Sequence, residues 1–209
     1  MGALEHAANL EAVKTMISDE ALMLDFQRGS RPAFEELFAR YREPLYGFFR
    51  RRLQNPERAE ELAQETFLAV IRGAARYEPR ALVRTYLYGI ALKLVAAERR
   101  KQQTSATVPL DGEPASDNAS EATLWVRQAL EKLDAGEREI LMLREYEQLS
   151  YSEIADLLRL PVNTVRSRLF RSRMALKSHL EGKSQGAFAA GGAAGSTSGG
   201  DASPLQGEG

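Results

Sequence analysis

The sequence predicts an all-α protein with two small helical domains joined by a flexible linker. Apolar residues recur at positions i, i+3 and i+4 in both halves of the chain. No segment alternates apolar and polar residues as a half-buried strand would. The two periodic blocks flank a stretch rich in Ser, Thr, Pro and Asp over residues 104–120, and 209 residues suffice for two modest domains.

The first block covers about residues 20–103 and is helical in pattern almost throughout. Its first apolar face runs from Ala33 to Phe49, and Pro44 lies within this stretch, where we expect it to start or kink a helix. Asn55 and Pro56 suit the N-cap and the first position of the next helix. That helix, about residues 57–73, has the following apolar face: Ala59, Leu62, Ala63, Phe67, Val70 and Ile71.

The rest of the first block is predicted as a loop followed by one more helix. Residues 74–84 contain Pro79 and lack a helical stripe. From Tyr86 to Lys101 the apolar residues return to helical spacing, and the helix ends on three basic side chains.

The second block, about residues 121–181, contains a candidate helix-turn-helix. Ser150 and Glu153 form a capping-box pattern in front of a short helix that ends at Leu158. Arg159 and Leu160 leave room only for a tight connection before Pro161, which opens a longer helix. A short helix, a brief turn and a longer helix are typical of this DNA-binding motif.

The ends of the chain and the linker differ from the helical blocks in charge and composition. Residues 26–103 hold 16 basic and 9 acidic side chains, whereas residues 104–123 hold four acids and no base. Residues 1–19 form an N-terminal arm. Gly, Ala and Ser make up 19 of the 28 positions in 182–209, so we expect this tail to be disordered.

Composition excludes several classes of function. The chain has no cysteine and two histidines that lie far apart, so we expect no disulfide, no metal site and no cofactor. Clustered Glu60, Glu61 and Glu65 lack a His, Cys or phosphate loop that would make them an enzyme site, and we expect no catalytic residue. Without an apolar run long enough for a membrane span or a basic signal sequence, the sequence predicts a cytoplasmic protein that does not insert into membranes.

The last helix carries the chemistry of DNA recognition. Between Val162 and Ser178 it holds four Arg, one Lys and no acid. Its first turns offer donors that suit base edges and phosphates in the major groove. These expected contacts to duplex DNA are Ser152 on the preceding helix and Asn163, Thr164, Arg166, Ser167, Arg168 and Arg171 on the last helix.

Two of these arginines cannot share one role. Arg166 and Arg168 lie about 200° apart around a helix, so both cannot reach the groove floor. Arg171 shares the face of Arg168. We expect Arg166 to read bases and the other two to grip phosphates.

Three stretches resemble one protein family. Residues 133–176, LDAGEREILMLREYEQLSYSEIADLLRLPVNTVRSRLFRSRMAL, resemble region 4 of bacterial sigma factors. Residues 59–72, AEELAQETFLAVIR, resemble the region 2 helix that binds RNA polymerase, and residues 84–91, RTYLYGIA, resemble the promoter-reading helix that follows it. The order and the missing central domain resemble the extracytoplasmic-function (ECF) group of the sigma-70 family.

The resemblance implies a region 2-like bundle over 20–103 that binds core RNA polymerase and the melted −10 strand. A region 4-like domain over 121–181 would read the −35 element. The polymerase contacts carried over, with the acidic edge of the same helix, are Glu61, Leu62, Gln64, Glu65 and Phe67. The expected −10 contacts are Tyr77, Arg80, Arg84, Tyr86, Lys93 and Arg100, which supply the aromatic and basic groups that single-strand capture needs.

The chain departs from the family pattern at four positions. The family usually has Trp at Tyr86, Asn at Lys93, and often Asp or Asn at Ala97. Phosphate contact would therefore replace amide hydrogen bonds on the promoter-facing side. Arg159 stands where the turn commonly has Gly, which implies backbone strain of about 1 kcal/mol if φ is positive there.

The resemblance also implies partners, namely core RNA polymerase, promoter DNA and an anti-sigma factor. An alternative is a helix-turn-helix transcriptional regulator with an N-terminal helical sensor domain, which would bind duplex DNA alone as a dimer. The motif over residues 59–72 favours the sigma factor.

Overall fold

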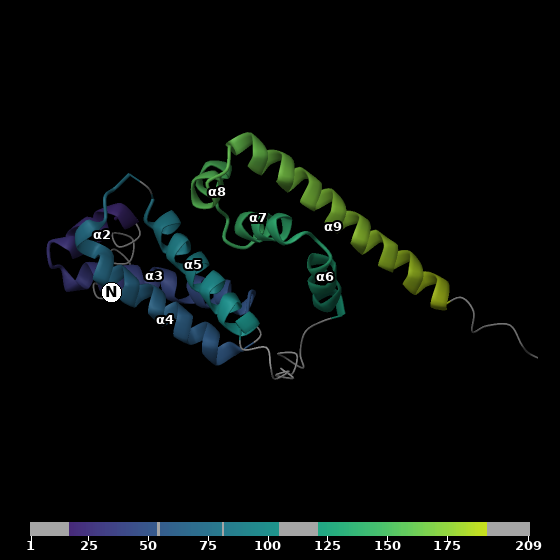
Figure 1. Cartoon of the computed structure of the whole chain (residues 1–209), viewed down its shortest axis with the longest axis horizontal. Coiled ribbons are helices and arrows are strands. Elements are labelled where there is room, and N and C mark those ends of the chain that lie inside the picture. The colour runs from purple at the N-terminus through teal and green to yellow at the C-terminus, as the bar shows by residue number, and fades with distance from the viewer. Residues whose placement is uncertain (1–16, 54, 81, 105–120, 192–209) are drawn as a thin grey trace, which may run out of the picture. The chain divides into compact units, whose positions relative to one another are not determined.

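The computed structural model describes residues 17–53, 55–80, 82–104 and 121–191, with side chains in the last segment described from 124 to 181. Within these residues the structure is helical apart from turns and short connections and contains no strand, which confirms the all-α prediction. The elements are α2 (Asp19–Gln27), α3 (Arg31–Arg50), α4 (Pro56–Gly73), the 3₁₀ turn η1 (Ala74–Arg76), α5 (Val83–Thr104), α6 (Glu121–Glu131), α7 (Ala135–Glu145), α8 (Tyr151–Leu158) and α9 (Val162–Gly191) (Figure 1).

The described residues form two compact units. The first comprises those of residues 1–118 and 142–166, and the second comprises those of 119–141 and 167–209. The sequence predicts a single domain over 121–181, but α8 and its flanking residues belong to the first unit.

Short polar side chains start the first helices. Oγ of Ser18 accepts a hydrogen bond from the N–H of Ala21, and Oγ of Ser30 accepts one from Ala33. Asn55 caps α4 in the same way, with its Oδ1 3.0 Å from the N–H of Arg58. Each cap satisfies an N–H group that no carbonyl of its own helix can reach. The start predicted at Asn55 and Pro56 is therefore confirmed.

Pro44 does not start a helix, because α3 runs through it from Arg31 to Arg50. A proline inside a helix removes one backbone hydrogen bond and costs about 3 kcal/mol. Tyr41, Leu45 and Phe48 around Pro44 are all buried. Tertiary packing of this apolar face therefore holds the helix together across the proline.

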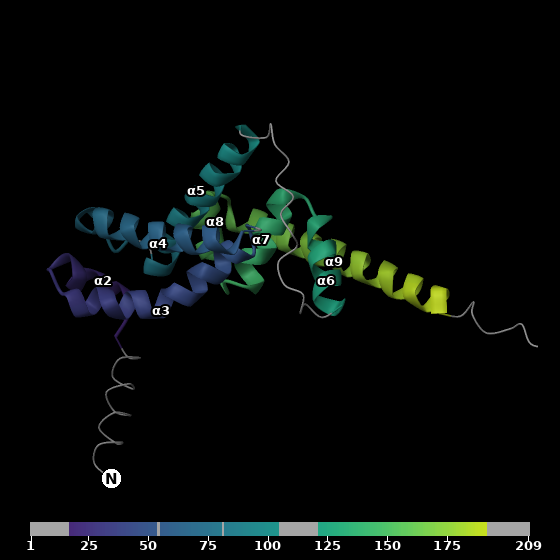
Figure 2. The same ribbon diagram turned by 90° about the horizontal axis from the view of Figure 1, so that it is seen from below.

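Aromatic side chains build much of the core of the first unit. Phe48 and Phe49 on α3 are fully buried. The ring of Phe67 on α4 meets those of Phe34 and Phe38 on α3, with centroids 6.3 and 4.7 Å apart. Helix α2 lies alongside α3 (Figure 2). The core thus joins α2, α3 and α4.

Helix α5 begins earlier than the sequence predicts. It starts at Val83 instead of Tyr86, and η1 takes up residues 74–76 of the predicted loop. Val83 is fully buried, so packing favours the extra turn. The connection between η1 and α5 is correspondingly short.

The helix-turn-helix forms as predicted. Glu153 N–H donates to Ser150 Oγ at 3.2 Å, and Ser150 N–H donates to a Glu153 carboxylate oxygen at 2.8 Å, which confirms the capping box. Arg159 ends α8 with φ 54° and ψ 48°, in the left-handed region that favours glycine.

The last helix is longer than predicted. Helix α9 continues to Gly191, so residues 182–191 of the predicted disordered tail are helical. Extending an existing helix gains one hydrogen bond per residue without a new nucleus, and this offsets the poor helix propensity of the three glycines among these ten residues, while three alanines favour the helix. Residues 192–209, the arm up to residue 16 and the linker residues 105–120 lie outside the described residues.

Candidate polymerase and nucleic-acid interfaces

A hollow between α3 and α4 brings two predicted polymerase contacts together. It has a volume of about 440 Å³. Gln64 and Phe67 from α4 line it with Phe38 and Tyr46 from α3. The amide of Gln64 is exposed, whereas Phe67 is 5% exposed and forms part of an apolar wall. The hollow can accept a side chain from a partner helix, with a polar group beside it.

Leu62, a third predicted polymerase contact, belongs to the core. Its side chain is 1% exposed, because its position on α4 points it at the neighbouring helices. Leu68 and Ile71 are instead exposed by 51% and 46%. The apolar face predicted from the sequence omits Leu68 and places Ile71 on the buried side. Residues 60, 64, 68 and 71 share one side of the helix. Their spacing is the sequence signal that could have placed Leu68 and Ile71 on the exposed side.

The predicted acidic edge of α4 is organised around one arginine. Arg58 lies 2.7 Å from a carboxylate oxygen of Glu61 and 3.3 Å from one of Glu65. It also pairs with Glu98 of α5 at 2.9 Å. Hydrogen bonds from Arg58 lower the pKa of Glu98 below its usual value. The edge thus joins α4 to α5 and is partly neutralised from within the molecule.

Two tyrosines lie at the base of the predicted −10 loop. Their rings, from Tyr77 and Tyr86, are 5.4 Å apart between centroids at an angle of 56°. Tyr77 is 7% exposed, and burial raises its pKa. A Cβ atom on Gly73 would lie 2.6 Å from the Tyr86 hydroxyl, so this glycine permits the close approach. Tyr86, the half-buried member, is the more accessible ring.

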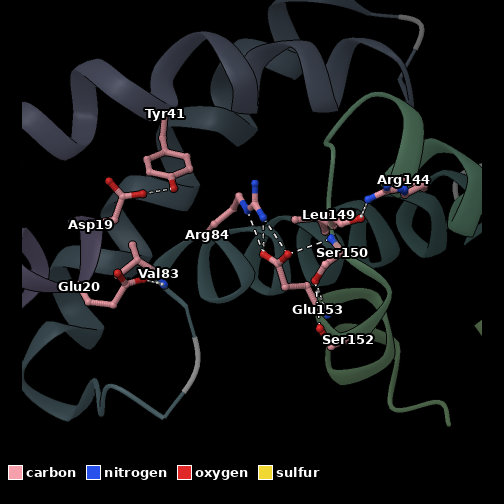
Figure 3. Close-up of polar contacts among 10 residues, drawn as sticks. All are labelled: Asp19, Glu20, Tyr41, Val83, Arg84, Arg144, Leu149, Ser150, Ser152 and Glu153. Carbon is pink, nitrogen blue, oxygen red and sulfur yellow. Dashed lines mark hydrogen bonds and ion pairs between the residues drawn. The ribbon is translucent and has the colours of Figure 1, made fainter. Parts of the chain in front are cut away.

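Two of the three arginines predicted to bind the −10 strand, Arg80 and Arg84, are in ion pairs. Arg80 pairs with Glu78 at 2.7 Å, and both side chains are largely exposed. Such a surface pair is weak and opens readily. Arg84 holds Glu153 of α8 through bonds of 2.6 to 2.9 Å (Figure 3).

Glu153 is well placed to hold Arg84. Its side chain is only 9% exposed, and its carboxylate also accepts the capping bond from the Ser150 N–H. Burial acts to raise the pKa of Glu153, but the bonds from Arg84 and Ser150 outweigh it and leave this pKa lowered. The pair uses Nε and Nη2 of Arg84, so these two groups can contact DNA only if the pair opens.

Further along α5, the predicted −10 contacts form a single face. Tyr86, Lys93 and Arg100 are spaced by seven residues, so they lie within about 40° of each other around the helix. Lys93 and Arg100 are exposed, as is Ala97 between them. This face offers one aromatic and two basic groups along about 21 Å.

Within the first unit, the predicted −35 contacts lie at the start of α9 and on α8. Asn163 and Arg166 are exposed, and Arg166 donates to the Asn163 Oδ1 at 3.0 Å. Thr164 is half-buried. Ser152 is exposed on the first turn of α8, where its hydroxyl lies 3.0 Å from that of Ser150.

The remaining predicted −35 contacts belong to the second unit. Ser167 is exposed and Arg168 is half-buried. Arg171 lies 3.4 Å from a carboxylate oxygen of Glu137 on α7. Ser172, fully buried, donates to the Glu137 carbonyl and so ties α9 to α7. A phosphate that Arg171 binds must compete with Glu137.

Among the described residues, no three or more His, Cys, Asp and Glu side chains gather as metal ligands would. The described helices likewise include none that is both long enough and apolar enough to span a bilayer.

Comparison with known families agrees with this arrangement. Residues 37–105 match the model for Sigma-70 region 2, and residues 123–176 match the model for Sigma-70, region 4. Both models describe parts of one class of protein, the sigma factors of transcription.

Individual relatives extend the match over most of the chain. The RNA polymerase sigma-H factor of Pseudomonas aeruginosa is 31% identical over 185 residues, which cover 80% of this chain and 96% of that protein. CarQ, an RNA polymerase sigma factor of Myxococcus xanthus, is 33% identical over an alignment that covers 70% of this chain and 88% of CarQ. The ECF sigma factor SigW of Bacillus subtilis is 27% identical over an alignment that covers 74% of this chain and 92% of SigW.

Solved structures share the fold. CnrH, in complex with the cytosolic domain of CnrY, aligns with a TM-score of 0.61 at 24% identity, over 78% of this chain and 97% of that one. RpoE of Bartonella quintana, in complex with the anti-sigma factor NepR, aligns with a TM-score of 0.60 at 22% identity. The alignment covers 71% of this chain and 96% of RpoE.

The chain belongs to the ECF group of the sigma-70 family. As a sigma factor it binds core RNA polymerase and directs initiation at particular promoters. Sigma factors are not enzymes.

Proposed function

We propose that three surfaces of this sigma factor divide the work of initiation. The hollow between α3 and α4 binds core polymerase, the Tyr86–Lys93–Arg100 face of α5 binds the melted −10 strand, and the start of α9 reads the −35 duplex. The observation that carries the proposal is the α5 face, because its aromatic and basic groups suit a single strand.

The polymerase surface combines the hollow with its apolar continuation along α4. Gln64 supplies a polar anchor beside Phe67, and Leu68 and Ile71 extend the contact by one and two turns. Apolar groups at such spacing bind the face of a partner helix. Glu61 and Glu65 flank this surface and attract basic side chains, although Arg58 shares their charge.

On the −10 side, Lys93 and Arg100 grip phosphates while Tyr86 stacks on a base. Arg80 joins them from the loop once its exposed pair with Glu78 opens. Nε and Nη2 of Arg84 become available when Glu153 releases them. Tyr77 packs against the ring of Tyr86 and holds it in place, because the Tyr77 ring is itself buried.

On the −35 side, Arg166 reads bases with Asn163, which already holds its guanidinium. Arg168 and Arg171 grip phosphates, with Ser152, Thr164 and Ser167 as further donors.

The α5 face is tested with alanine variants and a matched control. The probe is a single-stranded −10 oligonucleotide from a promoter that wild-type holoenzyme selects out of a randomised library. Lys93→Ala and Arg100→Ala should each weaken binding and lower its salt slope by about 0.7. Arg99→Ala removes an equal charge next to Arg100, about 100° away around the helix, and should leave both unchanged. Equal losses for Arg99→Ala and Arg100→Ala would contradict the proposed face.

The polymerase surface is tested by core binding without DNA. Gln64→Arg and Leu68→Ala should weaken binding to core polymerase while helicity by circular dichroism stays constant. Arg99→Ala changes an exposed residue on another helix, α5, and serves as control. Unchanged affinity in both test variants would remove this surface from the proposal.

An anti-sigma protein is the further partner we propose. The two solved structures described above each contain a second protein, with CnrH bound to the cytosolic domain of CnrY and RpoE to the anti-sigma factor NepR. On this chain, Phe170 and Met174 of α9 are 66% and 51% exposed and one turn apart. Large apolar side chains exposed together favour a protein contact. We also propose that the protein acts in the cytoplasm, because bacterial RNA polymerase and promoter DNA are in that compartment.

A further inference from the structure

The segment between η1 and α5 is held at both ends by helix α2. At its first end, the side-chain amide of Gln27 donates to the carbonyl oxygens of Ala74, at 2.5 Å, and Tyr77, at 2.7 Å. At its second end, the N–H of Val83 donates to a carboxylate oxygen of Glu20 at 3.0 Å. Figure 3 shows Glu20 reaching the start of α5.

Glu20 and Gln27 are seven residues apart on α2. That spacing places them on the same side of the helix, about 10.5 Å from each other along its axis. One rigid helix therefore sets the separation of the two ends of the segment.

Helix α2 is itself anchored to the core. Met23, between the two holding residues, is fully buried. Asp19 accepts hydrogen bonds from the Tyr41 hydroxyl and from Arg40 at 2.8 Å, both on α3. A displacement of α2 would therefore disturb α3 as well, which makes α2 a fixed reference.

The chemistry at each end suits this holding role. The first N–H groups of a helix have no acceptor within it, and the residue before α5, Leu82, has a side chain that cannot supply one. The Glu20 carboxylate supplies it from another helix and adds a negative charge where the helix dipole favours one. Gln27 joins two carbonyls at the end of η1, where helical bonding stops.

We propose that α2 positions the −10 recognition segment, with Glu20 and Gln27 as positioning residues that do not themselves touch DNA. This inference rests on the proposed −10 role of the segment and of the α5 face. Holding both ends before DNA arrives reduces the ordering that capture of a strand must otherwise supply. Helix α2 precedes residues 37–105, the part that matches region 2, so this role lies outside the matched region.

The test compares variants of the full chain in holoenzyme. Glu20→Ala and Gln27→Ala each remove one end of the attachment. Each should weaken binding of the single-stranded −10 oligonucleotide about tenfold, or about 1.4 kcal/mol, which is the range expected for the net loss of one or two hydrogen bonds. Glu20→Gln retains an acceptor oxygen and should restore most of the affinity. Asp25→Ala removes an exposed carboxylate from the same helix and should have no effect.

Two further measurements separate positioning from general damage. Affinity for core polymerase should be unchanged in all four variants. Hydrogen exchange at the amides of Arg80, Leu82 and Val83 should accelerate in Glu20→Ala and Gln27→Ala, but not in Asp25→Ala. Weaker oligonucleotide binding together with intact core binding and faster exchange would establish the role.

Different outcomes would overturn the positioning role and the −10 assignment. Unchanged exchange in both Glu20→Ala and Gln27→Ala, or equal oligonucleotide binding by these variants and wild type, would overturn the positioning role. If Lys93→Ala and Arg100→Ala also bind the oligonucleotide as wild type does, the −10 assignment of the α5 face fails as well. A loss confined to Lys93→Ala and Arg100→Ala would overturn the positioning role alone.

Discussion

Glu147 is buried in the first unit and holds two arginines, of which Arg52 is buried, so its removal should be costly. Its carboxylate oxygens lie 2.9 and 3.0 Å from Arg51 and 3.2 Å from Arg52. The side chains of Glu147 and Arg52 are each 1% exposed, while that of Arg51 is 29% exposed. Arg52 also donates to the Phe48 carbonyl at 3.0 Å. Its guanidinium therefore cannot turn to water without leaving the core.

Glu147→Gln keeps the shape of the side chain and removes its charge. Breaking a buried pair by removing one partner typically costs about 3–5 kcal/mol, because a charge stays buried without compensation. Water can reach Arg51, so we expect a cost of about 3 kcal/mol, at the low end of that range. With a urea dependence of about 2 kcal/mol per molar, the midpoint of unfolding should fall by about 1.5 M. Circular dichroism during urea titration measures the shift.

The control is Glu43→Gln, which breaks an ion pair with Arg42 at 3.4 Å whose side chains are 74% and 66% exposed. It should change the free energy of unfolding by less than about 0.5 kcal/mol. Arg52→Met in the Glu147→Gln background should cost less than in wild type, since the unpaired charge has gone. A Glu147→Gln cost below about 1 kcal/mol, or additive effects of the two changes, would refute the reasoning.

Four other substitutions have expected outcomes. Arg159→Gly should raise the free energy of unfolding by about 1 kcal/mol in urea titration, because φ is 54° there; a destabilised variant would contradict the strain. Arg58 lowers the pKa of Glu98 below 4.5, the usual pKa of a glutamate. The pair therefore stabilises the folded protein fully above pH 4.5, and this stabilisation is lost as the pH falls through the lowered pKa. Glu98→Gln should flatten the acid side of the stability–pH curve, and an unchanged slope would count against this account. In transcription from a library randomised across the −35 element, Arg166→Ala should relax preference at one position and Arg168→Ala should weaken all promoters alike; the reverse pattern would exchange their roles.

Signals carried by neighbouring residues were sufficient to predict much of the fold. The cap at Asn55 and the capping box of Ser150 and Glu153 need residues only three positions apart, and both form as predicted. Local rules mislead where tertiary packing outweighs them. The helix through Pro44 is the example, because the buried face around the proline offsets its lost hydrogen bond.

For the candidate sites, the sequence predicts which helices carry them but does not decide which side chains face outward. The polymerase motif indicated α4, yet Leu62 is buried and Leu68 is exposed. The two residues differ by six positions, and which of two leucines faces the core depends on where the neighbouring helices pack. An apolar stripe records that a face is buried but leaves its edges undefined.

By itself, the sequence determined the helical class, the order of the motifs, the family and the basic start of the last helix, since each is encoded by residues close together in the chain. Only the tertiary structure decided the partners of the charged groups. Arg84 pairs with Glu153 across 69 positions, and Gln27 reaches Tyr77 across 50. Such pairs leave no periodic or spacing signal, because they depend on which helix surfaces meet once the apolar faces are buried.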